Sequence, residues 1–174
     1  MTTSEFNEER FASVREMGIW KRLSADSNFP WSETLIDRYQ DKLNWKSLSG
    51  NSNVLWTASM LEKYQNQLNW KVLSKRACNG LYSIENLKRF SSNWDWSALT
   101  TNVCWTMEKV EEFKDFIDWS NMINNWENSH LYTLEFFEKY KDYFFSIVSL
   151  KQSRLWDDVM DIYKDKLIEQ ILAQ

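Results

Sequence analysis

Apolar and polar residues follow one another along this chain in a pattern that recurs about every 25 residues. Each recurrence opens with an aromatic residue followed at once by a small polar residue. The seven pairs are Phe6-Asn7, Trp31-Ser32, Trp56-Thr57, Tyr82-Ser83, Trp105-Thr106, Tyr132-Thr133 and Trp156-Asp157. Their intervals are 25, 25, 26, 23, 27 and 24 residues. Self-similarity at such a period is typical of stacked structural repeats.

Within a repeat, the apolar residues predict an amphipathic helix. Counted from the aromatic residue as position 0, positions 5, 8 and 12 are mostly apolar, as in Ile36, Tyr39 and Leu43. This spacing places them on one helical face. The polar residue at position 1 is a preferred N-cap, and Glu33 and Glu135 follow in the first turn, where the helix dipole favours a negative charge. We expect a helix of about 12 residues in each repeat.

A second, shorter helix is expected in each of the first five repeats. Tryptophan stands at position 14, and an apolar residue three positions later shares its helical face. The tryptophans are Trp20, Trp45, Trp70, Trp96 and Trp119. Asn44, Asn69 and Asp95 precede three of them and are suited to cap this helix. One such hairpin cannot bury its apolar face alone, so neighbouring repeats must stack.

The sequence therefore predicts an all-α fold, a single right-handed α-solenoid of about seven short helix-turn-helix repeats. It would form one domain over residues 1–174, with units starting near residues 6, 31, 56, 82, 105, 132 and 156. A compact globular array of helices is the structural alternative.

The pattern weakens towards the end of the chain, as terminal repeats often do. Ser146 replaces the tryptophan of the sixth unit, and the seventh unit, from Trp156, has no second helix. Its apolar residues Met160, Tyr163 and Leu167 keep the helical spacing. The segment Asn121–His130 is expected to be an irregular loop.

Composition supports a helical protein without a membrane span. The chain has 11 Trp but only 3 Gly and 1 Pro, which suits an all-helical fold. Its net charge of −4 is spread over interspersed acids and bases, which disfavours nucleic-acid binding. No run approaches the length of a membrane helix, and the polar first ten residues predict no secretory signal. With two cysteines, Cys78 and Cys104, we expect a cytoplasmic protein.

The run from Trp56 to Ser74 reads Trp-Thr-x-x-x-Leu-Glu-Lys-Tyr-x-x-x-Leu-Asn-Trp-x-x-Leu-Ser. It resembles a tandem Trp-containing helical repeat of uncharacterised bacterial proteins, those of Bacteroidetes in particular. The resemblance covers nearly the whole chain and is best in the units that begin at Trp31 and Trp56. It implies a repeat fold and a bacterial origin, and it brings no activity and no catalytic residues.

Candidate chemistry is sparse, so we expect no enzyme, cofactor or metal. His130 is the single histidine, so a Ser/His/Asp or Cys/His site would have to use it. It precedes an aromatic anchor, where a surface or helix-start residue is expected. Cys78 and Cys104 are expected to be buried or semi-buried thiols, since zinc requires more ligands than these. No Gly-rich phosphate loop is present, and the paired carboxylates fall on polar helix faces.

The tryptophans are expected to pack in the core rather than to bind a ligand. Periodic positions are explained by the same packing need in every unit. This prediction covers Trp31, Trp45, Trp56, Trp70, Trp96 and Trp105. Trp94 and Trp126 depart from the period and are the better candidates for exposure.

One recurring feature is not required by packing. Position 15 is Lys21, Lys46 and Lys71, with Arg22 adjacent to the first. Stacked units would align these side chains into a basic stripe that can steer an acidic partner; ordinary solvated lysines are the other interpretation. The stripe ends where position 15 becomes serine in later units.

Two function hypotheses follow. The first is a non-enzymatic protein–protein interaction scaffold, one version being a bacterial immunity or inhibitor protein that masks a toxin. The alternative is a carbohydrate- or nucleic-acid-binding module that uses exposed tryptophans. The candidate partner contacts are Lys21, Arg22, Lys46, Lys71, Trp126 and His130.

Overall fold

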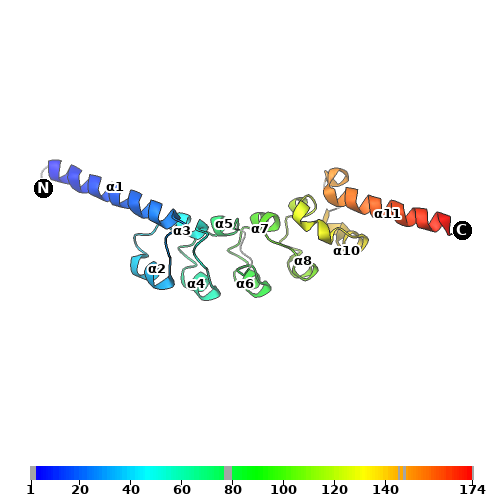
Figure 1. The fold of residues 1–174 in the computed structure, drawn as a ribbon, viewed down its shortest axis with the longest axis horizontal. Helices are drawn as coiled ribbons and strands as arrows, with labels where there is room; N and C mark the ends of the chain where they lie inside the picture. The colour runs from blue at the N-terminus through cyan, green and yellow to red at the C-terminus, as the bar shows by residue number, and fades with distance from the viewer. Residues whose placement is uncertain (1–2, 77–79, 145, 147, 174) are drawn as a thin grey trace. The chain divides into compact units, whose positions relative to one another are not determined.

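The computed structural model is all-helical over the residues it describes, 3–76, 80–144, 146 and 148–173, with side chains described from residue 13 onward. No β-strand occurs in this part of the chain. The α-helices are α1 (Thr3–Ala25), α2 (Glu33–Tyr39), α3 (Trp45–Gly50), α4 (Ala58–Lys63), α5 (Trp70–Leu73), α6 (Ile84–Arg89), α7 (Trp96–Asn102), α8 (Met107–Phe113), α9 (Trp119–Met122), α10 (Leu134–Phe144) and α11 (Arg154–Leu172) (Figure 1). Two 3₁₀ helices are η1 (Trp126–Leu131) and η2 (Leu150–Gln152). The all-α prediction is confirmed.

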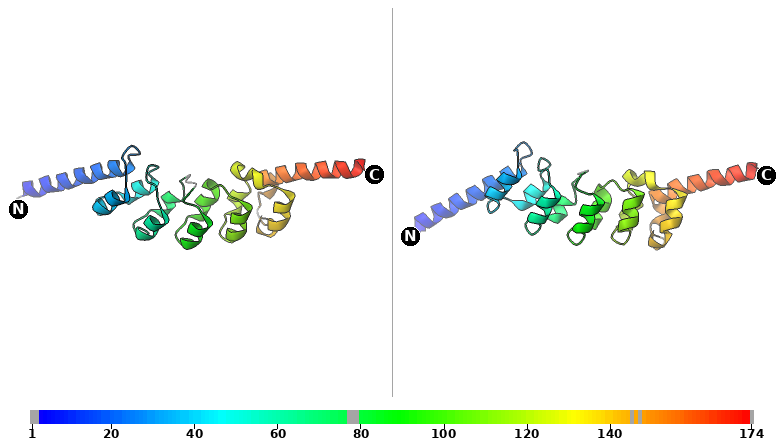
Figure 2. Two further views of the ribbon diagram at one scale, coloured as in Figure 1. Left: turned by 60° about the horizontal axis from the view of Figure 1, so that its bottom comes forward. Right: turned by 90° about the horizontal axis from the view of Figure 1, so that it is seen from below.

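The chain divides into two compact units. Unit 1 comprises Met1–Leu81 with Phe90–Trp94, and unit 2 comprises Tyr82–Arg89 with Asp95–Gln174. In unit 1, α3 packs against both α1 and α5. In unit 2, α9 packs against α7 and α10, and α10 packs against α11. In unit 1 the alternate helices α1, α3 and α5 therefore lie side by side, and so do α7 and α9 in unit 2, as both views of Figure 2 show.

The polar residue at position 1 caps a helix in five of the seven predicted units. In each case the side-chain oxygen accepts the backbone N–H three residues later, at 3.1–3.3 Å. The pairs are Ser32–Leu35, Thr57–Met60, Ser83–Asn86, Thr106–Lys109 and Thr133–Phe136. The predicted caps of the shorter helices are confirmed as well, at Asn44, Asn69 and Asp95.

The first helix of the second to fifth repeats is shorter than expected, and side chains replace a backbone hydrogen bond where it ends. α2 has 7 residues and α4 has 6. An uninterrupted helix would join the N–H of Asn44 to the carbonyl of Gln40. Instead, Asn44 donates to the Ser24 hydroxyl at 3.0 Å, and the Trp45 indole N–H donates to the Gln40 carbonyl, also at 3.0 Å. We call this arrangement the corner.

The corner recurs in both units. In unit 1, Asn69 donates to Ser49 and Trp70 to the Gln65 carbonyl, at 2.9 and 2.8 Å. In unit 2, Asp118 donates to Thr100 and Trp119 to the Lys114 carbonyl, at 3.2 and 2.9 Å. A hydroxyl of one repeat thus ends the helix of the next.

A turn before the corner preserves the apolar spacing. The carbonyl of Tyr39 still accepts the N–H groups of Lys42 and Leu43, at 2.9 and 3.2 Å. Leu43 is therefore held on the apolar face and is buried, although the regular helix has ended. For this reason the apolar residues keep a 3.6-residue period up to position 12, although the regular helix ends before that position.

The first predicted unit is wrong. α1 runs without interruption from Thr3 to Ala25, so Asn7 lies inside a helix and does not begin one. Gly18 stands where later units bury leucine, and Val14, at a predicted core position, is 59% exposed.

The seventh predicted unit is also wrong at its start. Ser153 caps α11 by accepting the N–H of Trp156 at 3.2 Å, so Trp156-Asp157 falls inside the helix. Ser153 and Leu155 are fully buried, and Leu155 donates its backbone N–H to the Ile123 carbonyl at 3.0 Å. This contact with α9 fixes the start of α11 earlier than the aromatic anchor.

The position-14 tryptophans contact the next repeat along the chain. Each ring lies 5.1–5.4 Å, centroid to centroid, from the aromatic ring at position 8 of that repeat. The pairs are Trp20–Tyr39, Trp45–Tyr64, Trp70–Phe90, Trp96–Phe113 and Trp119–Tyr140. Such pairs contribute about 0.5–1.5 kcal/mol each beyond area burial, so they hold neighbouring helices of each unit together.

The expected irregular loop, Asn121–His130, is largely helical. Its start belongs to α9, and residues from Trp126 form η1. Asn125 caps η1 by accepting the N–H of Glu127 at 3.1 Å, and Asn128 is buried. No described helix is long and apolar enough to cross a membrane.

Candidate functional site

The predicted basic side chains of unit 1 lie on successive helices. Lys21 and Arg22 are in the last part of α1, Lys46 is in the first turn of α3, and Lys71 is in α5. All four are exposed. Because α1 packs on α3 and α3 on α5, the structure brings these helices together in order. We call Lys21, Arg22, Lys46 and Lys71 the basic column.

The corner explains why Lys46 and Lys71 have fixed backbone positions. Lys46 follows Trp45, whose indole N–H is bonded to Gln40 and whose ring contacts Tyr64. Lys71 follows Trp70, which donates to Gln65 in the same way. The column therefore rests on rigid ring contacts, with only its own long side chains free to adjust.

Carboxylates do not neutralise the basic column. Neither α3 nor α5 contains an acidic residue, and none of the column's four side chains makes an ion pair or hydrogen bond within the described residues. A cationic surface without internal partners keeps its full charge for a bound partner.

The other side of unit 1 is different. Lys63 of α4 lies 3.2 Å from Glu33 and 2.6 Å from Asp37, both on α2. Tyr64 also donates to Asp37, at 2.6 Å. These bonds hold the pKa of Asp37 below its ordinary value and raise that of Lys63. Burial, together with the bond to Asp37, raises the pKa of Tyr64 to about 12. The charged side chains of α2 and α4 therefore pair with one another within unit 1.

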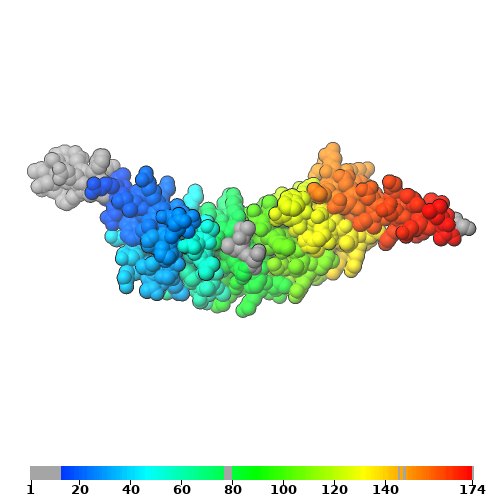
Figure 3. All heavy atoms as spheres, in the orientation of Figure 1, coloured from blue at the N-terminus to red at the C-terminus, as the bar shows by residue number. Residues whose placement is uncertain are grey.

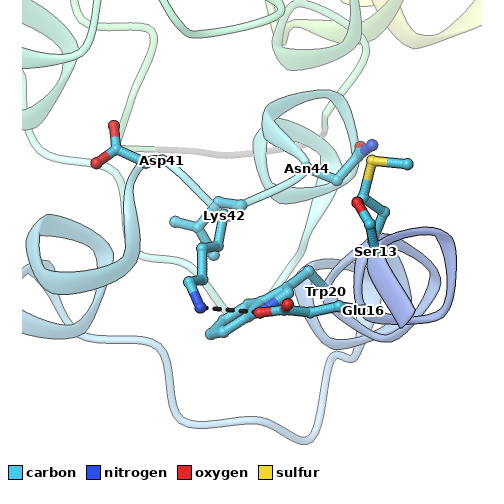
Figure 4. A pocket seen from close by; sticks show the side chains of 8 residues that line it. Ser13, Glu16, Trp20, Asp41, Lys42 and Asn44 are labelled. Atoms are coloured by element: carbon cyan, nitrogen blue, oxygen red, sulfur yellow. Dashed lines mark hydrogen bonds and ion pairs between the residues drawn. The ribbon is translucent and has the colours of Figure 1, made fainter. Parts of the chain in front are cut away.

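A hollow of about 420 Å³ is lined in part by Trp20, the residue before Lys21 of the basic column. Figure 4 shows its wall, with Ser13, Glu16 and Trp20 from α1 opposite Lys42 and Asn44. The Lys42 ammonium lies 2.8 Å from Glu16 and 5.8 Å from the centroid of the Trp20 ring.

The hollow exists because Trp20 has no corner. Its indole N–H donates to Glu16 at 3.3 Å, whereas Trp45 and Trp70 donate to turns that lie against their rings. With α1 uninterrupted, one side of the Trp20 ring is left open. The ring and Met17 offer an apolar floor that suits an apolar anchor of a protein partner. The charged side chains of the lining are Glu16, Asp41 and Lys42, and Lys42 is paired with Glu16.

Two further candidate residues lie in unit 2. Trp126 is 66% exposed, which confirms its predicted exposure. The His130 ring lies with Nδ1 3.0 Å from the Glu127 carbonyl and Nε2 3.0 Å from the Trp105 carbonyl. A histidine held between two backbone carbonyls ties η1 to the start of α8, and this geometry is structural.

Other predictions for single side chains are wrong. Trp94 is 5% exposed, because its ring packs edge-on against Trp70 at 4.8 Å. Cys104 is exposed, not buried, since it lies in the loop before a helix; Cys78 lies outside the described residues.

Of the tryptophans assigned to the core, Trp31, Trp56 and Trp105 are buried, and Trp45, Trp70 and Trp96 are half-buried.

No cluster of three or more histidine, cysteine or acidic side chains suited to a metal ion occurs in the described part of the chain. No pair of described residues has the arrangement of a nucleophile and its base around His130, since both ring nitrogens face carbonyls.

Sequence reasoning missed the buried hydroxyls at position 18. They are Ser24, Ser49, Ser74 and Thr100, each with no exposed surface. Each donates to the carbonyl of its own repeat's tryptophan, at 2.7–2.8 Å. The signal was present, because a hydroxyl follows an apolar residue in each of these four repeats.

No known family model matches the chain, and neither the curated proteins nor the solved structures compared with it contain a similar protein. The resemblance to a bacterial Trp-containing repeat stays a prediction.

Proposed function

We propose that this protein is a non-enzymatic scaffold for protein–protein interaction, built as a single right-handed α-solenoid of helical repeats. Corners and ring pairs recur in both units, which supports one repeat architecture over residues 1–174. The basic column carries the functional part of the proposal. It is a row of unpaired cations on consecutive helices of a protein whose net charge is −4.

The spacing of the column favours an acidic helix as the bound element. Packed helices lie about 8–10 Å apart, so successive lysines of the column are separated by roughly that distance. Two turns of an α-helix advance about 11 Å. A partner helix with carboxylates every seven residues would therefore match the column, and the Trp20 hollow would take an apolar side chain at its end.

One version of this function is a bacterial immunity or inhibitor protein in the cytoplasm that masks a toxin. Its support is indirect: the small size, the mild acidity and the absence of a described metal or catalytic cluster. Electrostatic steering through the column would speed capture of an acidic toxin surface.

The test uses charge reversal with a matched control. Lys21→Glu, Lys46→Glu and Lys71→Glu together should abolish capture of acidic proteins from host lysate, identified by mass spectrometry. The control, with arginine at the same three positions, keeps the charge and should retain capture. Melting temperatures should be unchanged, because all three side chains are exposed. Equal capture by both variants would refute the assignment.

Spacing is tested with two synthetic helical peptides of identical composition. One carries glutamate every seven residues and the other every five. Fluorescence anisotropy should show at least tenfold tighter binding of the first peptide, with loss of binding in high salt because the contacts are exposed charges. Equal affinities would show that the column acts only as diffuse charge.

The alternative, a carbohydrate- or nucleic-acid-binding module, depends on exposed rings. All eleven tryptophans have described positions, and Trp126 is the one that is more than half exposed. A single exposed ring offers no stacking platform for successive sugars or bases, so the protein scaffold is the function we favour.

A further inference from the structure

The C-terminal half of α11 has no packing partner among the described residues of its own unit. Leu155 and Val159, in its first two turns, are fully buried where α11 packs on α10. From Asp161 to Ala173 every residue is exposed. Figure 3 shows this segment, in red, standing clear of the rest of unit 2. We call Asp161–Ala173 the overhang.

The overhang carries an apolar stripe. Tyr163, Leu167 and Ile171 recur every fourth residue on one face, and Ile168 and Leu172 lie beside them. Their exposed fractions are 59%, 48%, 61%, 44% and 81% in that order. Contiguous exposed side chains of this size mark an interaction surface rather than ordinary solvent-facing residues.

An isolated helix of this length is marginal in water, because helices below about 12–15 residues gain too little from their own hydrogen bonds. α10 shows what an apolar face receives elsewhere in unit 2: Phe136, Tyr140 and Phe144 are buried, and their rings lie against Trp119 of α9. The stripe lacks any such cover among the described residues.

We propose that the stripe pairs with the same stripe of a second copy, so that two α11 overhangs form an antiparallel helix pair. An identical apolar face is complementary to itself under two-fold symmetry. The four-residue spacing of Tyr163, Leu167 and Ile171 keeps these three side chains along one face of the helix, where a second helix can pack. An antiparallel arrangement also keeps the packed first turns of both copies at opposite ends and opposes the helix dipoles.

Charge favours a second copy over a strongly charged partner. The overhang carries Asp161, Asp165 and Glu169 against Lys164 and Lys166, so two copies repel one another little. The basic column, by contrast, is all of one sign. The two surfaces are thus suited to different partners, and the dimer does not depend on the proposed scaffold function.

The area predicts a weak dimer. The exposed fractions of the five side chains correspond to roughly 500 Å² per copy, so pairing would bury at most about 1,000 Å² in total, the lower limit for a specific interface. We expect a reversible dimer with a dissociation constant on the order of tens of micromolar.

Sedimentation velocity of the full chain tests this between 1 and 300 µM. The 21.0 kDa monomer should convert to a dimer with rising concentration and go no further. Leu167→Glu with Ile171→Glu should weaken dimerisation at least thirtyfold. Ile162→Glu, about 140° away around the helix, is the matched control and should dimerise as the native protein does.

Hydrogen exchange gives a second readout, since amides of the overhang should become protected only as the dimer forms. A monomer at every concentration would overturn the proposal. So would an open-ended series of oligomers that Val14→Glu abolishes, because that result would identify the exposed face of α1 as the other half of a head-to-tail contact. Equal dimerisation by the native protein and the Leu167/Ile171 variant would overturn it as well.

Discussion

Removing the hydroxyl of Ser49 tests whether the corner stabilises the fold. Ser49 has no exposed surface, accepts the Asn69 N–H at 2.9 Å and donates to the Trp45 carbonyl at 2.7 Å. In Ser49→Ala the carbonyl remains within helix α3, but the Asn69 N–H loses its acceptor. A buried donor left without a partner costs about 1–3 kcal/mol.

The part-buried setting of Asn69 places the expected loss near the lower half of that range, at about 1.5 kcal/mol. Urea denaturation followed by circular dichroism should show a lower midpoint at an unchanged slope, which identifies a loss of stability without a change in the exposed area. Because each 1.4 kcal/mol is about a factor of ten in equilibrium constant, the folding equilibrium should fall roughly tenfold.

Two controls separate the hydrogen bond from the substitution itself. Ser49→Thr should keep most of the stability, because Thr100 fills the equivalent buried position in unit 2 and makes the same two contacts. Ser52→Ala, at an exposed loop residue, should change stability by less than about 0.5 kcal/mol. If Ser49→Ala and Ser52→Ala have the same midpoint, the corner does not contribute and the reasoning fails.

Three other predictions concern the cap, the ion pairs and the exposed ring. Thr106→Ala should lower stability by about 1 kcal/mol in urea denaturation, while Thr106→Ser should retain it; equal losses would refute the cap. The bonds from Lys114, Lys139 and Tyr140 lower the pKa of Glu111 from 4.5 to about 2. Its stabilising effect is therefore complete above pH 4.5 and disappears as pH falls towards 2, and Glu111→Gln should flatten the acid side of a stability–pH profile. Trp126→Phe should remove the most acrylamide-quenchable fluorescence, whereas Trp31→Phe should leave it; unchanged quenching in the first variant would contradict the exposure of Trp126.

Local signals in the sequence predicted the helix starts well. A cap is decided by one side chain and a backbone N–H three residues away, so Ser32 and Thr57 were recognisable without tertiary information. The ring period likewise predicted which faces are apolar. Helix ends were less predictable, because the corner at Asn44 depends on the hydroxyl of Ser24, 20 residues earlier.

The first and last repeats show that a helix start, too, can depend on tertiary contacts. Phe6-Asn7 has the residues of a helix start, yet α1 continues through it. Trp156-Asp157 has them too, and Ser153 takes the cap instead because Leu155 bonds to α9. A capping residue in the sequence indicates where a helix can begin. Contacts with the neighbouring repeat determine whether the helix begins there.

The candidate partner contacts could be predicted where a recurring residue has no role in packing. Lys21, Lys46 and Lys71 stood out because position 15 faces no packing need, and the structure leaves them exposed and unpaired. Trp94 misled for the opposite reason: its departure from the period was taken as freedom from the core, but it fills the space beside Trp70.

The corner links these two outcomes. Each corner uses a tryptophan and a hydroxyl to end a helix. It thereby fixes the backbone position of the residue after the tryptophan, which is exposed. Where the corner is complete, as at Trp45 and Trp70, that place presents a lysine and the ring is covered by its own turn. Where it is absent, at Trp20, the same ring lines a hollow. The corner therefore fixes the positions of Lys46 and Lys71, and its absence accompanies the hollow at Trp20. A partner of the kind we propose that used both features would contact the first repeat.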